Sequence, residues 1–193
     1  MSKKNIIGIV IAVVVIFWGV SIFNSMVAMD EEVIAQWANV ETQYQRRADL
    51  IPNLVSTVKG YAAHEKETLE AVVQARAKAT STTIDAGNLN AASIQQFQEA
   101  QSGLSSALSR LLVTVEKYPD LKANQNFLEL QAQLEGTENR IAVERSRFNN
   151  KVKDYNTYIR NLPEKFVAMI AGFEKKTGFA AQEGSENAPK VEF

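Results

Sequence analysis

The residue types that most often carry out chemistry are scarce in this sequence, and their spacing does not build a catalytic site. The chain has no cysteine and one histidine, His64, which stands beside Glu65 and Glu67. A catalytic metal needs several ligands, and a nucleophilic triad needs a base with its own partner. A lone histidine among charged neighbours therefore indicates a solvated helix residue, with catalysis or metal binding as the minor alternative.

Sequence motifs for the commoner enzyme classes are missing as well. The chain contains no Gly-rich phosphate loop and no HExxH or GxSxG motif. A di-iron site in a helical bundle needs two ExxH motifs, which one histidine cannot supply. We therefore predict that the protein is not an enzyme and has no catalytic residues, metal or cofactor. Acid–base work by carboxylates alone, at Glu138 or Glu65, is the remaining enzymatic alternative.

Two arginines stand where a bulky apolar side chain is expected. Arg47 and Arg145 both fall on the apolar stripes of predicted helices. A charge in such a place must be paired or must reach solvent, because its desolvation is costly. The candidate carboxylate partners are Glu41, Asp49, Glu135 and Glu138. We predict an internal polar network that fixes helix register, built on Arg47, Arg145, Glu138 and Asp49. A polar surface for a binding partner is the alternative.

The elements that position these residues are long amphipathic helices. Apolar residues recur at alternating steps of four and three, as in a coiled coil, which places them on one helix face. The first stripe consists of Val33, Trp37, Val40, Tyr44, Arg47, Ile51, Leu54, Val58 and Tyr61. It predicts one long helix from the N-terminal segment to about Thr80, kinked at Pro52; a break near Gly60 is the alternative.

Further helices follow a polar loop over residues 81–92. One is predicted from about Ser93 to Tyr118, and the next from a cap at Asn124 to Leu162, before Pro163. A short amphipathic segment over residues 166–173 is either a fourth helix or a contact with lipid. The fold class is therefore all-α: an N-terminal transmembrane helix, an antiparallel bundle of three long helices and a short C-terminal amphipathic helix.

The N-terminal segment is long and apolar enough to cross a membrane. Residues Ile6 to Phe23 carry no charge, and about 20 apolar residues span the hydrocarbon core. A cleaved signal peptide is the alternative, but this run is too long for one, and Met26 is a poor residue at the third position of a cut after Ala28. We predict a stub over 1–5, an anchor over 6–29, a bundle domain over 30–178 and a flexible tail over 179–193.

Charges on the two sides of the anchor predict its orientation. Lys3 and Lys4 precede it, and Asp30, Glu31 and Glu32 follow it. Because positive residues stay in the cytoplasm, we expect a single-pass membrane protein with its N-terminus inside and its bundle outside, in the periplasm or at the cell surface. The formal net charge of −1 and the lack of a basic stripe disfavour nucleic acid as a partner.

Long stretches of the sequence resemble the LemA family. They are YQRRADLIPNLVSTVKGYAAHE (44–65), Ala75-Arg76, YPDLKANQNFLELQAQLEGTENRIAVER (118–145) and FNNKVKDYNTYIRNLP (148–163). The resemblance covers nearly the whole chain from the anchor to about Phe179. It implies a bacterial envelope protein with one N-terminal span and a helical bundle, but no established activity or binding residues. Family members in magnetosome membranes, and beside other membrane proteins, suggest a role in envelope organisation.

These observations favour a non-catalytic envelope scaffold or adaptor. We expect its partners to be the lipid bilayer, further copies of the chain and an unidentified envelope protein. The alternative is an extracytoplasmic sensor or regulator subunit of a membrane complex. A pocket between helices near Arg47 and Arg145, together with a cytoplasmic output partner, would distinguish that alternative.

Overall fold

The computed structural model describes residues 2–87 and 89–180, and these form six helices and no strand. The prediction of an all-α fold with a long apolar N-terminal helix is confirmed. The helices are α1 (Lys3–Tyr61), α2 (Lys66–Ser81), α3 (Ala91–Val115), α4 (Pro119–Lys122), α5 (Gln125–Tyr158) and α6 (Glu164–Ala171).

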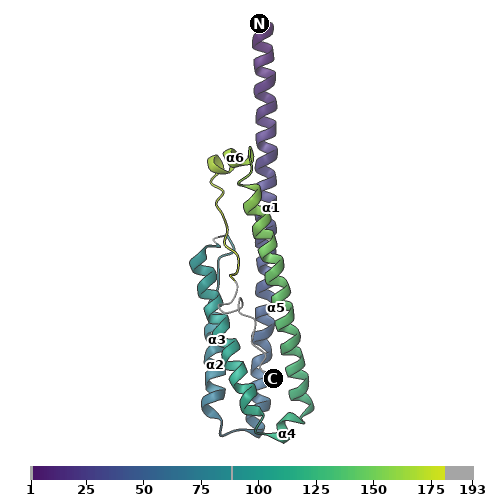
Figure 1. The fold of residues 1–193 in the computed structure, drawn as a ribbon, viewed down its shortest axis with the longest axis vertical. Coiled ribbons are helices and arrows are strands. Elements are labelled where there is room, and N and C mark those ends of the chain that lie inside the picture. The colour runs from purple at the N-terminus through teal and green to yellow at the C-terminus, as the bar shows by residue number, and fades with distance from the viewer. Residues whose placement is uncertain (1, 88, 181–193) are drawn as a thin grey trace, which may run out of the picture.

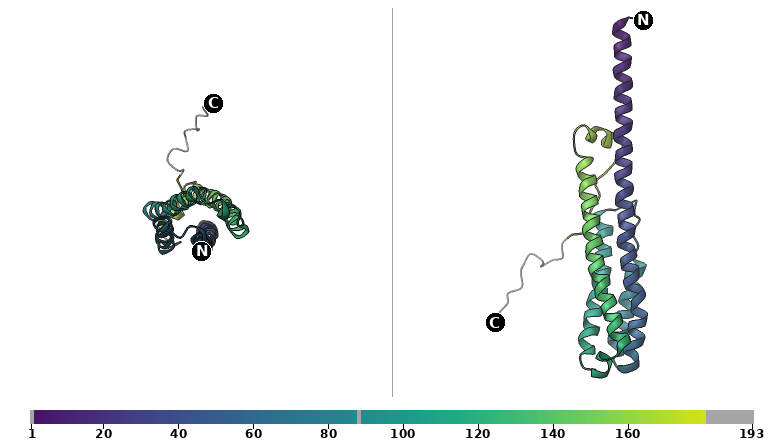
Figure 2. Two further views of the ribbon diagram at one scale, coloured as in Figure 1. Left: turned by 90° about the horizontal axis from the view of Figure 1, so that it is seen from below. Right: turned by 90° about the vertical axis from the view of Figure 1, so that its right-hand side faces the viewer.

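The four long helices α1, α2, α3 and α5 lie side by side and run in alternating directions (Figure 1). The short α4 forms the turn between α3 and α5 at the far end of the bundle, and α6 lies at the opposite end beside α1. In the end-on view of Figure 2, α2, α3 and α5 form an arc around α1. The N-terminal part of α1 extends beyond all the other elements, and its apolar side chains from Ile6 to Val20 are exposed.

The predicted helix to about Thr80 ends at Tyr61 instead, so the alternative break near Gly60 is correct. Helix α1 closes when the Ala62 N–H donates to the carbonyl of Val58 at 2.8 Å. Helix α2 then folds back along α1, which gives the bundle four long helices where three were expected. The apolar pattern continues weakly into α2, so the periodicity alone favoured one continuous helix. The antiparallel packing of α2 on α1 buries Leu69 and Val72 of α2.

Pro52 lies inside α1 without ending it. A proline has no N–H, so the carbonyl four residues earlier, that of Ala48, loses its helical hydrogen bond. The Nε–H of Arg76, on α2, donates to this carbonyl at 2.7 Å. The neighbouring helix thereby supplies the missing donor, which gives a structural reason for the arginine at this position.

The core consists of two apolar clusters stacked along the bundle. The upper cluster surrounds Trp37 and extends towards the anchor as far as Ile22 and Met26. The lower cluster surrounds Leu54 and extends towards α4. On each of the helices α1, α3 and α5, a short polar interval separates the two clusters.

Asparagine side chains cap the starts of α3 and α5. The predicted cap at Asn124 is confirmed, since its side chain accepts from Phe127 N–H.

Candidate functional site

A polar layer crosses the bundle between the two apolar clusters. Its centre is Arg47, which is 2% exposed, and the other buried polar side chains among the described residues are Gln101 and Thr137. Arg47 comes from α1, Gln101 from α3 and Thr137 from α5. All three lie at one level, because each falls between the upper and the lower apolar cluster on its own helix.

Hydrogen bonds from Arg47 connect the helices at this level. Its Nη1 donates to Glu138 Oε1 at 2.5 Å and to Ser105 Oγ at 3.0 Å, and its Nη2 donates to Gln101 Oε1 at 2.7 Å. The Gln101 side chain in turn donates to the carbonyl of Ala79 on α2 at 3.3 Å. The layer therefore joins α1, α2, α3 and α5. Arg47 Nε has no hydrogen-bond partner among the described residues.

The polar layer forms part of a cleft of about 630 Å³ between α3 and α5, floored by α1. Amides and hydroxyls dominate its walls, and its charged side chains are two arginines and two glutamates, which balance. The polar lining residues are Tyr44, Arg47, Gln95, Gln98, Glu99, Gln101, Ser102, Ser105, Glu138 and Arg145. Such a surface is suited to hydrogen-bond a neutral polar group. Among the described residues, no three His, Asp or Glu side chains are grouped to hold a metal ion.

The predicted network residues are placed in different ways. Arg47 and Glu138 form the ion pair, and Arg145 lines the same cleft. Asp49 lies elsewhere, where it accepts from Gln45 Nε2 at 2.9 Å on the exposed side of α1. His64 is exposed, as expected, but it lies in the turn after α1 and pairs with the Tyr118 hydroxyl at 2.7 Å.

Arg145 contacts the chain beyond α6. Its guanidinium lies over the Phe179 ring at 4.5 Å from the ring centre, and Nη2 donates to the Ala180 carbonyl at 3.4 Å. No carboxylate of the described residues lies within ion-pair distance of it. Tyr44 lines the same cleft as Arg145. Burial raises the pKa of the Tyr44 phenol, although the nearby guanidinium groups of Arg145 and Arg47 oppose the shift. The Tyr44 phenol therefore stays neutral at physiological pH.

Sequence reasoning missed a pair of asparagines that bind the segment 174–180. Asn149 Oδ1 accepts from Phe179 N–H at 2.8 Å, and its Nδ2 donates to the Phe179 carbonyl at 3.1 Å. Asn156 makes the same two bonds to the main chain of Lys176, at 3.0 and 2.8 Å. The signal was present as two asparagines seven residues apart inside a predicted helix, where asparagine is unfavourable without a partner.

This asparagine clamp, Asn149 with Asn156, changes the predicted end of the folded domain. The flexible tail was predicted from 179, yet Phe179 is only 7% exposed and its ring stacks on Trp37 at 5.7 Å. Gly178 permits the close approach, because a Cβ there would come within 2.6 Å of Asn149 Oδ1. The remaining predicted tail, residues 181–193, lies outside the described residues.

Substituting Asn149→Ala is expected to loosen the segment 174–180 by about 1–3 kcal/mol, because two main-chain groups of Phe179 lose their partners. Amide hydrogen exchange at Phe179 and Lys176 should speed up, while exchange in the centre of α5 stays unchanged. Asn150→Ala, at an exposed neighbouring position, is the matched control and should have no effect. Equal exchange rates in both variants would contradict the role assigned to the clamp.

Comparison with known sequences gives a consistent family assignment. The sequence model of the LemA family matches residues 36–193. The chain is 28% identical over 172 residues to the magnetosome protein MamQ of Magnetospirillum gryphiswaldense, covering 79% of this chain and 62% of that protein. It is 27% identical over 175 residues to the magnetosome protein MamQ 2 of Paramagnetospirillum magneticum, covering 81% and 64%.

A more distant relative is the protein LemA of Metamycoplasma hominis, with 23% identity over 160 residues, covering 83% of this chain and 69% of that protein. The chain spans less than two thirds of the length of the magnetosome proteins that it matches.

Proposed function

This chain belongs to the LemA family, and on that premise we propose that it is a non-catalytic, membrane-anchored scaffold or adaptor of the bacterial envelope. The observation that carries the proposal is the continuity of α1, which runs for 59 residues from the apolar segment into the core. Within the described residues it is the one helix long and apolar enough to span a membrane. A bundle built on such a helix is held stiffly at the bilayer surface. The relatives named as magnetosome proteins support a membrane role.

We propose that the bundle lies on the periplasmic or outer side of the inner membrane, with the N-terminus in the cytoplasm. The support is the charge pattern, with lysines before the apolar run and acidic residues after it. The polar cleft is the surface that we assign to an envelope protein partner, because its amides and hydroxyls lie together on three packed helices and line an open hollow. Tethering in one membrane also raises the effective concentration of further copies, which favours self-association through weak contacts.

The full-length protein is therefore expected to be a homo-oligomer at the membrane. The chain has no cysteine, so a single cysteine placed by Val143→Cys on α5, where Val143 is 48% exposed, provides an unambiguous cross-linking site. Cross-linked species in native membranes, and a mass above that of one chain in nanodiscs, are the expected results. Val113→Cys on α3 provides a second, separate position. A strictly monomeric protein with no cross-link at either position would refute self-association.

A sensor or regulator is the second candidate, and the position of the polar cleft against α1 favours it. The pocket near Arg47 and Arg145 that such a function needs is present as the polar cleft. Its floor belongs to α1, so a ligand that displaced Glu138 from Arg47 would act on the helix that enters the membrane. The discriminating result is a cytoplasmic partner. Cross-linking of the residues before Ile6 to a cytoplasmic protein, dependent on Arg145, would favour the sensor over the scaffold.

A further inference from the structure

Helix α6 carries an apolar face that the bundle leaves uncovered. On its inner side, Ala168 is buried in the upper cluster and Val167 packs against that cluster. On its outer side, Phe166, Met169 and Ile170 are 59%, 73% and 84% exposed. Their spacing of three and four residues places these three side chains together on one face. Leu162, just before the helix, is 71% exposed and adds to this outer face.

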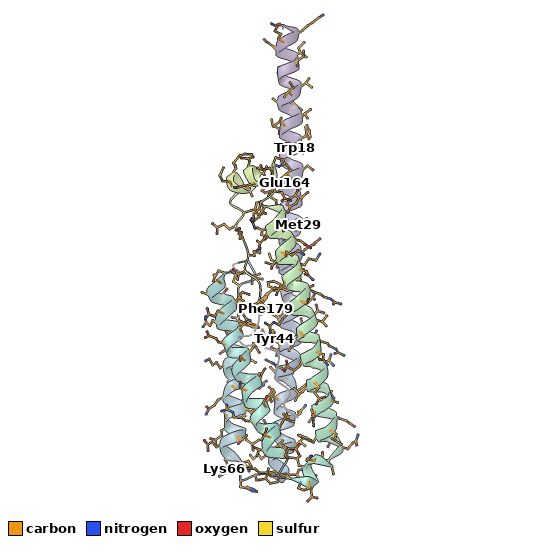
Figure 3. All side chains as sticks on the ribbon, viewed as in Figure 1. Trp18, Met29, Tyr44, Lys66, Glu164 and Phe179 are labelled. Atoms are coloured by element: carbon orange, nitrogen blue, oxygen red, sulfur yellow. The ribbon has the colours of Figure 1, made fainter. Side chains whose placement is uncertain are left out.

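The outer face lies at the level where the apolar segment of α1 ends. The ring of Phe173, just after α6, lies 5.6 Å from the ring of Phe23. In Figure 3, Glu164 at the start of α6 lies between the levels of Trp18 and Met29 of α1. The run from Ile6 to Phe23 is about 27 Å long as a helix, which is close to the thickness of the hydrocarbon core. If this run spans the bilayer, α6 is at the boundary between hydrocarbon and headgroups.

We propose that α6 is an interfacial membrane helix, whose outer face of Leu162, Phe166, Met169 and Ile170 inserts among the lipid acyl chains of the outer half of the bilayer. This inference rests on the proposed anchoring of α1. Helix α6 has eight residues, about 12 Å, which is too short to span. It lies across the direction of α1 rather than along it (Figure 1), which is the orientation of a helix in the plane of the interface.

The surroundings of α6 fit lipid as its occupant. Phe23 and Val27 of α1 are 41% and 38% exposed, so the outer face of α6 continues the apolar surface of the anchor. Lys165 in the first turn of α6, Arg160 before the helix and Lys175 after it are all exposed. Long basic side chains reach headgroups while their stems remain in apolar surroundings. Insertion at two points, α1 and α6, would fix the depth of the anchor and the tilt of the bundle.

Fluorescence quenching by brominated acyl chains tests the proposal with the full-length chain. The sequence has two tryptophans, Trp18 in the apolar run and Trp37 in the core. Trp37 lies about 20 Å beyond Phe23, the end of the apolar run, along the axis of α1. The probe protein combines Trp18→Phe with Met169→Trp, at one chain per nanodisc of phosphatidylcholine and phosphatidylglycerol. The matched control combines Trp18→Phe with Val113→Trp, at a position that is 70% exposed on α3. Trp18→Phe alone gives the contribution of Trp37.

We expect bromine to quench the indole introduced at position 169 about as strongly as it quenches Trp18 in the unmodified protein. It should leave the indole at position 113 and Trp37 unaffected. Quenching of Trp18 without quenching at position 169 would overturn the interfacial role of α6 and leave the anchor intact. Shielding of the indole at position 169 from bromine and from an aqueous quencher would assign the face to protein contact, and would also overturn it. Lack of quenching at Trp18 would refute the anchoring and this inference together.

Discussion

Replacing Glu138 by alanine is expected to destabilise the bundle by roughly 3 kcal/mol, at the lower end of the range for breaking a buried ion pair. The Glu138 side chain is 46% exposed, and a surface ion pair would contribute less than about 1 kcal/mol. The larger effect follows because its partner Arg47 is 2% exposed and cannot move its charge into solvent. The exposure of the Glu138 carboxylate itself keeps the loss at this lower end of the range.

The Arg47 side of the pair is expected to respond differently. Arg47→Met removes the buried charge and leaves Glu138 able to reach water. It also takes the Arg47 donors away from Gln101 Oε1 and Ser105 Oγ, and the loss at the buried Gln101 costs about 1–3 kcal/mol. The double variant Arg47→Met/Glu138→Ala should therefore be more stable than Glu138→Ala alone. Urea unfolding of the full-length protein in mild detergent, followed by circular dichroism, gives the four free energies of this cycle. Glu135→Ala, an exposed glutamate on the same helix, is the control. A loss below about 1 kcal/mol for Glu138→Ala would show that the pair behaves as a surface contact.

Trp37→Ala should cost about 3–5 kcal/mol, the range for removing a large aromatic side chain from a core. Trp37 is fully buried, and its ring lies 5.2 Å from that of Phe97, 5.4 Å from that of Phe148 and 5.7 Å from that of Phe179. It therefore joins α1, α3, α5 and the segment 174–180 at one point. Its loss leaves a cavity that three separate elements would have to collapse to fill.

The same unfolding measurement in detergent tests this prediction. Trp37→Phe keeps an aromatic ring in the site and should lose less stability than Trp37→Ala. Trp18→Ala changes a residue that is 54% exposed on the anchor, so the unfolding free energy of the bundle should not change. The amide of Phe179 should exchange faster in Trp37→Ala, since its side chain loses the stacking contact. If Trp18→Ala and Trp37→Ala were equally destabilising, the central packing role of Trp37 would be wrong.

The sequence by itself determined the features that depend on local pattern. The uncharged run from Ile6 to Phe23 defines a helix suited to a membrane, because hydrophobicity and length are local properties. Steps of three and four define the helices and their inner faces, because helical geometry repeats along the chain. The same pattern marked Arg47 and Arg145 as polar residues in apolar positions. The LemA resemblance, confirmed by the match over residues 36–193, also rests on these stretches.

Only the tertiary structure decided which helix faces which partner. The apolar spacing of α1 continues into α2, so the sequence pattern does not show the turn after Tyr61. Only the packing of α2 back along α1 shows where that turn lies. Arg47 pairs with Glu138, 91 residues away, rather than with Asp49, because packing brings α5 to the Arg47 side of α1. Phe179 follows a polar segment, yet the asparagine clamp on α5 and the Trp37 ring hold it in the core. These pairings depend on the free energies of contacts between residues far apart in the sequence. A local pattern of apolar residues carries no information about those contacts.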